Sequence, residues 1–80
     1  MKRLPRTLSS GIQVTDFYMD DGGRDRRLGR TFPTHHPEYP LQAFWCNPQG
    51  DAYEYGDSHY VKTEDEAEIW LLTLLGQSLR

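Results

Sequence analysis

The end of this 80-residue chain carries its strongest structural constraint, an amphipathic helix with a defined start. Thr63 and Glu66 have the spacing of a capping box, in which a hydroxyl and a carboxylate each accept a hydrogen bond from a backbone N–H at the helix start. The pattern predicts that the helix begins at Glu64 and that Gly76 forms its C-terminal cap. The apolar residues at helical spacing form the predicted core stripe: Ala67, Trp70, Leu71, Leu74 and Leu75.

Two further apolar residues of this segment, Ile69 and Leu72, fall outside that stripe. They make the apolar face wider than packing on one sheet needs. The sequence therefore predicts either a second layer of chain over the helix or a homodimer through it.

The residues before the helix have the composition of strands. Residues 12–19 are rich in β-branched and aromatic side chains, and a change of phase along them predicts a bulge near Thr15 or Asp16. Residues 20–23, Asp-Asp-Gly-Gly, predict a tight turn, and residues 26–32 predict the return strand. The first half is thus expected to form a hairpin.

A second hairpin is expected after a stiff loop. Residues 33–40 contain three prolines and predict the loop. Strands are predicted at 41–46 and 52–55, with a turn between them at 47–50. Another turn is predicted at 56–58, followed at 59–61 by a short edge strand or a lead-in to the helix. Residues 1–10 are expected to be a flexible basic arm or a late-ordering edge. The predicted fold of residues 11–80 is one α+β domain, an antiparallel sheet of about four strands with the C-terminal helix packed on a face.

Length and cysteine content restrict the class of protein further. Eighty residues leave little room for a deep catalytic cleft, so a non-enzymatic protein is expected. Cys46 is the only cysteine, which excludes an intramolecular disulfide and favours a reducing, cytoplasmic location. The longest apolar run, 69–72, is too short to span a bilayer, so no membrane association is expected.

Charge is distributed unevenly along the chain. The net charge is −3, but residues 1–30 hold seven basic and four acidic side chains, whereas residues 31–80 hold two basic and eight acidic ones. Such a chain can hold itself together electrostatically or present opposite faces to partners. The acidic residues predicted to steer a protein partner are Asp51, Glu54 and Asp57.

The second half is also aromatic. Because side chains alternate along a strand, about half of the strand aromatics must face away from the helix, and outward tyrosine and tryptophan are enriched at the energetic centres of interfaces. The predicted aromatic contact residues are Tyr39, Trp45, Tyr53 and Tyr55. A protein partner is therefore the main hypothesis.

Arginines of the first hairpin supply an alternative, nucleic-acid binding. Arg24, Arg26, Arg27 and Arg30 can place guanidinium groups on phosphates. Interspersed aspartates and a pI near 5.5 weigh against this alternative.

Metal binding and catalysis have less support. His35, His36, Glu38, Cys46 and His59 are all permissible zinc ligands, but their spacing matches no known zinc pattern. Cys46 with His59 as nucleophile and base lacks a supporting motif, and a cysteine in an apolar strand is usually a packing residue. We expect no cofactor, no metal and no catalytic residue.

In size, acidic pI and sheet-plus-helix layout, the chain resembles small phage and mobile-element proteins that inhibit host machinery, anti-CRISPR proteins among them. The resemblance spans the whole chain and assigns no site residue. It implies a stoichiometric inhibitor that covers a nucleic-acid-binding or partner surface of a larger bacterial complex.

Overall fold

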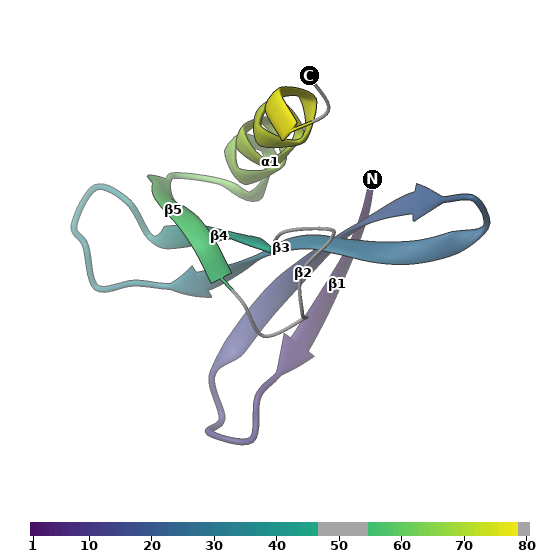
Figure 1. Cartoon of the computed structure of the whole chain (residues 1–80). Coiled ribbons are helices and arrows are strands. Elements are labelled where there is room, and N and C mark those ends of the chain that lie inside the picture. The colour runs from purple at the N-terminus through teal and green to yellow at the C-terminus, as the bar shows by residue number, and fades with distance from the viewer. Residues whose placement is uncertain (47–54, 79–80) are drawn as a thin grey trace.

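The computed structural model describes residues 1–46 and 55–78, which form one antiparallel sheet with a helix across one face (Figure 1). The five strands lie in the sheet in chain order, and the elements are β1 (Lys2–Thr7), β2 (Gln13–Asp21), β3 (Arg24–Pro33), β4 (Leu41–Cys46), β5 (Tyr55–Val61) and α1 (Glu64–Ser78). The predicted α+β class, antiparallel sheet and C-terminal helix are confirmed. The sheet has five strands rather than about four.

The additional strand is β1, which lies within the segment expected to be a flexible arm or a late-ordering edge. Lys2 pairs with Tyr18 and Thr7 with Gln13 in a continuous antiparallel register. Five of the six β1 residues are exposed, so the strand has no apolar alternation from which it could be recognised. Pro5 is tolerated because β1 is an edge strand. Of the two expectations for residues 1–10, a flexible arm or an edge, Lys2–Thr7 forms an edge strand whose order comes from backbone pairing with β2.

The first hairpin follows the prediction closely. Gly22 and Gly23 adopt φ values of 65° and 87°, and the Gly23 N–H donates to Asp20 Oδ1 at 3.0 Å. These left-handed conformations favour glycine and form the predicted turn. The predicted bulge is misplaced: the register shifts between Phe17 and Tyr18 rather than near Thr15 or Asp16.

The second half departs further from the sequence-based outline. Residues 56–58, expected to be a turn, lie within β5. The register with β4 shifts at this end, where Phe44 pairs with Ser58 but Cys46 pairs with Tyr55. The predicted turn at 47–50 and most of the predicted strand at 52–55 lie outside the described residues.

The helix start is confirmed by its hydrogen bonds. The Glu66 N–H donates to Thr63 Oγ1 at 3.2 Å, and the Glu66 carboxylate accepts from the Lys62 N–H at 2.8 Å. In a capping box the carboxylate accepts from the N–H of the cap residue, here Thr63, whereas in this helix it accepts from the residue before it, Lys62. Gly76 does not end the helix, which continues to Ser78.

The core lies between α1 and the sheet. Its buried members are Phe17, Ala43, Val61, Ala67 and Leu71, with Leu41, Trp45 and Trp70 packed against them. A Cβ added to Gly29 would lie 2.4 Å from the Phe44 carbonyl oxygen and 2.6 Å from Leu71 Cδ2. Glycine at this position therefore allows the helix to approach the sheet closely. In the part of the chain that the structure describes, no helix has the length and apolar character needed to cross a membrane.

Candidate functional site

Alternation along the strands gives the sheet two different faces. Phe17 and Ala43 contribute to the core beneath α1, so their strand neighbours Asp16 and Phe44 lie on the opposite side. We call this opposite side the open face. One cross-strand row on it runs through Asp16, Arg30, Phe44 and Ser58, and the next runs through Phe32, Gln42 and Tyr60.

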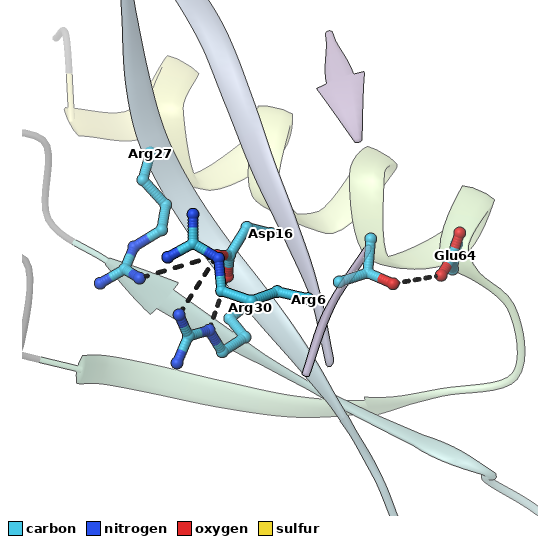
Figure 2. Close-up of polar contacts among 6 residues, drawn as sticks. Arg6, Asp16, Arg27, Arg30 and Glu64 are labelled. Atoms are coloured by element: carbon cyan, nitrogen blue, oxygen red, sulfur yellow. Dashed lines mark hydrogen bonds and ion pairs between the residues drawn. The ribbon is translucent and has the colours of Figure 1, made fainter. Parts of the chain in front are cut away.

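A buried ion cluster occupies the open face over β1, β2 and β3. Figure 2 shows the guanidinium groups of Arg6, Arg27 and Arg30 pointing toward the Asp16 carboxylate. Arg30 donates through Nε to Oδ1 at 2.5 Å and through Nη2 to Oδ2 at 3.2 Å. Arg6 Nε and Arg27 Nη1 lie 3.5 Å and 3.9 Å from Oδ2. We call these four residues the ion cluster.

The burial of the ion cluster indicates that it stabilises the fold. The Asp16 side chain is fully buried, while 10% of the Arg30 side chain and 52% of the Arg6 side chain are exposed. A buried carboxylate needs compensating charge and hydrogen bonds, which the converging arginines supply. The cluster thus ties three strands together on the side of the sheet that α1 does not cover.

Aromatic side chains continue the open face from the ion cluster toward β5. Arg30 Cζ lies 5.9 Å from the centre of the Phe32 ring, and Phe32 meets Phe44 edge-on with ring centroids 5.3 Å apart. Gln42 Nε2 donates to Ser58 Oγ at 3.3 Å in the adjoining strands. The face therefore combines guanidinium and aromatic groups on neighbouring strands.

At the β5 end, three rings and one ammonium group form what we call the aromatic cluster. The His36 ring centroid lies 5.1 Å from that of Tyr39 and 5.4 Å from that of Tyr60, and the two tyrosine rings are 6.3 Å apart. Lys62 Nζ lies 5.9 Å from the Tyr39 ring centroid. His36, Tyr60 and Lys62 are exposed and Tyr39 is half-buried.

The loop between β3 and β4 fixes two members of the aromatic cluster. The Thr34 N–H donates to the Pro40 carbonyl at 2.8 Å, and Thr34 Oγ1 donates to the Tyr39 carbonyl at 2.5 Å. His36 Nδ1 accepts from the N–H groups of Glu38 and Tyr39 at 3.1 Å and 3.3 Å. These bonds hold a proline-rich segment in one conformation beside Tyr60.

The predicted aromatic contact residues are not brought together as a set. Tyr39 joins the aromatic cluster, but Trp45 packs against the core on the helix side. Tyr55 is the first residue of β5, and Tyr53 lies outside the described residues. Of the predicted acidic residues, Asp57 is exposed on β5, whereas Asp51 and Glu54 also lie outside them.

The four hairpin arginines separate into two groups. Arg27 and Arg30 belong to the ion cluster. Arg24 and Arg26 are exposed near the β2–β3 turn, where Arg26 Nη2 lies 2.9 Å from Asp21 Oδ2. A single four-arginine surface is therefore not formed.

Two of the residues considered for metal binding or catalysis, His59 and Cys46, are packing residues in the structure. His59 stacks on Trp70 with ring centroids 5.7 Å apart, on the helix side of β5, and Cys46 is buried. Within residues 1–46 and 55–78, no group of three or more histidine, cysteine or acidic side chains has the geometry to hold a metal ion.

The helix also makes polar contacts with the sheet and retains an exposed apolar side. Thr15 Oγ1 donates to Glu64 Oε1 at 2.7 Å, and Arg3 Nη2 donates to Asp65 Oδ1 at 2.6 Å. The hydrogen bond to Asp65, with a further contribution from Glu68, raises the pKa of Arg3. Ile69 and Leu72 are 66% and 46% exposed, as the width of the apolar face predicts. A homodimer through this side stays a prediction.

The predicted contact residues did not include those that organise the open face: Arg6, Asp16, His36, Tyr60 and Lys62. Among these, His36 was considered only as a permissible zinc ligand. One signal was present, because a carboxylate in the middle of a strand of β-branched and aromatic residues must be exposed or paired. Comparisons of the chain with protein-family models, with curated proteins and with solved structures found no match.

Proposed function

We propose that this chain is a non-enzymatic protein-binding module that inhibits a larger bacterial complex, and that it contacts its target through the open face. The observation that carries the proposal is the aromatic cluster, in which exposed His36 and Tyr60 pack with Tyr39 beside a rigid sheet. Tyrosine is enriched among the residues that dominate interface energetics, and fixing its ring before binding lowers the entropic cost of association.

The remainder of the open face supports the same proposal. The ion cluster joins β1, β2 and β3, and Phe32 and Phe44 extend the open face from Arg30 along β3 and β4. Inhibition by occupying a surface requires rigidity and stoichiometric binding rather than a catalytic group. A target that handles nucleic acid agrees with the resemblance to small phage inhibitors.

The alternative, direct nucleic-acid binding through the first hairpin, has weaker support. Arg26 is paired with Asp21, and Lys2 Nζ lies 3.1 Å from Asp25 Oδ2, so nearby carboxylates offset the basic groups. Arg27 and Arg30 are directed toward Asp16. Phosphate binding would have to compete with these carboxylates.

Site-specific photo-crosslinking in cells that carry the gene tests the proposal. A photoreactive phenylalanine replaces Tyr60 in one variant and Leu72 in the matched control; the two side chains are similarly exposed, at 44% and 46%, on opposite sides of the sheet. We expect position 60 to give one dominant adduct with another protein, unaffected by nuclease, and position 72 to give none.

The other outcomes contradict the proposal in distinguishable ways. An adduct that nuclease removes supports the nucleic-acid alternative. Equal adducts from both positions mean non-specific contact, and no protein adduct from position 60 means that the open face is not the contact surface. A product of twice the monomer mass is self-association and does not count as a target.

A further inference from the structure

His36 is held in the loop by hydrogen bonds that only one of its charge states can accept. Its Nδ1 atom accepts from the N–H groups of Glu38 and Tyr39, at 3.1 Å and 3.3 Å. A ring nitrogen that accepts hydrogen bonds carries no proton, so the imidazole is neutral and its single proton is on Nε2. The same ring contacts Tyr39 and Tyr60.

Addition of a proton to Nδ1 reverses this arrangement. The imidazolium has two N–H donors and no acceptor, so both backbone hydrogen bonds are lost and Nδ1–H faces two other N–H groups. The bonds of Thr34 to Pro40 and to the Tyr39 carbonyl do not involve the imidazole and remain available. The effect is therefore confined to residues 36–39, while the sheet stays intact.

We propose that His36 makes the aromatic cluster sensitive to pH, so that the cluster is ordered when His36 is neutral and is released when Nδ1 is protonated. Histidine is the side chain that ordinarily changes charge between about pH 5 and 8. The aromatic cluster is therefore ordered on the alkaline side of this range and loses its order as the pH falls. The functional consequence, weaker target binding in acid, rests on the proposed function.

Among the residues that the structure describes, the charged and titratable groups around His36 come from two parts of the chain. The loop supplies His35, Glu38 and Tyr39, and β5 with the residue after it supplies Tyr60 and Lys62. The Lys62 ammonium group lies over Tyr39. Its positive charge disfavours a second cation in the cluster, whereas the Glu38 carboxylate favours one. The two hydrogen bonds that Nδ1 accepts determine which charge state of His36 fits the loop.

Amide hydrogen exchange tests the proposal without any target. We expect the protection factors of the Glu38 and Tyr39 amides to fall by about tenfold between pH 8 and pH 5, since each amide loses its hydrogen-bond acceptor. His36→Asn should remove this dependence, because an asparagine oxygen accepts from the N–H groups that follow it but does not titrate. The matched control His35→Asn should retain it.

Constant protection in the parent, or an equal fall in His36→Asn, would overturn the proposal. Because His36→Asn could also disturb the loop, ¹⁵N resonances of the parent imidazole give a second measurement. We expect Nδ1 to be unprotonated at pH 8 and to gain its proton as the Glu38 and Tyr39 amides lose protection. Protonated Nδ1 at pH 8, or protonation without a change in the amides, excludes the mechanism.

Crosslinking from position 60 at both pH values then separates this inference from the proposed function. Loss of the target adduct in acid for the parent, but not for His36→Asn, supports both. If the amides respond to pH but no target adduct forms at either pH, the proposed function fails and the loop mechanism stands. If the adduct is independent of pH while the amides respond, regulation of binding is wrong.

Discussion

Two adjacent residues of β2, on opposite faces of the sheet, are buried by different means. Beneath α1, Phe17, Ala43 and Leu71 exclude water by apolar packing. On the open face, Asp16 is as fully buried as its neighbour Phe17, but arginine side chains surround it. Strand alternation places these two adjacent residues on opposite faces of the same sheet.

This difference shows how a short chain can order a face that α1 does not cover. Apolar burial stabilises in proportion to the area removed from water and depends little on the partner's identity. A buried ion cluster stabilises the fold only if every charge in it is compensated by an opposite charge or a hydrogen bond. We therefore expect the open face to respond sharply to single charge changes and the helix face to respond to changes of volume.

The largest expected effect comes from removing the central charge of the ion cluster. Asp16→Asn preserves shape but leaves the converging arginines without their carboxylate, and we expect the free energy of unfolding to fall by about 3–5 kcal/mol. Chemical denaturation measures this. The matched control is Asp25→Asn, which breaks the exposed pair with Lys2 and should cost below about 1 kcal/mol. Similar losses for both variants would mean that the open face is not held by buried charge.

On the helix face, a single added carbon should be costly. Gly29→Ala places a methyl group against the Phe44 carbonyl and Leu71, so we expect a loss of about 1–3 kcal/mol from overpacking. Gly76→Ala is the matched control: this helical glycine has nothing within 4 Å of an added Cβ, and alanine should raise stability by about 0.5–1 kcal/mol. Thermal unfolding of both variants should shift in opposite directions. A neutral Gly29→Ala would disprove the close approach of α1.

The helix cap gives a smaller effect on the same face. Thr63→Ala removes the acceptor of the Glu66 N–H and should lower stability by about 1 kcal/mol. Thr73→Ala, whose hydroxyl donates to the Ile69 carbonyl within the helix, should change stability by less than about 0.5 kcal/mol. Circular dichroism during denaturation distinguishes them. Equal effects would show that the capping box contributes nothing beyond helix propensity.

The smallest effect concerns the ion pairs that join the edge strand to the helix. Arg3→Met should cost below about 1 kcal/mol, and the loss should shrink as salt screens these partly exposed pairs. The pKa of Arg3 is raised, so its contribution is fully present below the ordinary arginine range and is lost only in strongly alkaline solution. Between pH 6 and 9 the difference between parent and variant should therefore stay constant. A difference that varies within this window would point to another group.

The sequence predicted the elements whose signals are local. The Gly22–Gly23 turn and the Thr63 cap depend on residues close together in the chain, and both are confirmed. The sequence did not predict β1 as a strand, because β1 is ordered by backbone pairing with β2. Its side chains are mostly exposed and show no apolar alternation. Gly76 was misassigned because glycine is also tolerated near the end of a helix that continues.

The candidate site was harder to predict because its members come from separate strands. Arg6, Asp16 and Arg30 meet only once the register of β1, β2 and β3 is known, and the register shift after Phe17 changes which residues of β3 lie near Asp16. Likewise Tyr39 was named as a contact residue, but its neighbour Tyr60 comes from β5. Residue types suggested interaction chemistry, while pairing between strands determined the groups.

The order of strands in the sheet has a consequence for how the molecule forms. Because each strand pairs with the strand before it in the chain, the sheet can grow by closing one short loop at a time, without the long loop closures that slow β-sandwiches. We expect folding to be faster than for an all-β sandwich of equal length. α1 follows all five strands in the chain, so the apolar side of the sheet lacks this cover until α1 has been synthesised. The interval before the helix docks is therefore the stage at which this protein is most prone to aggregate.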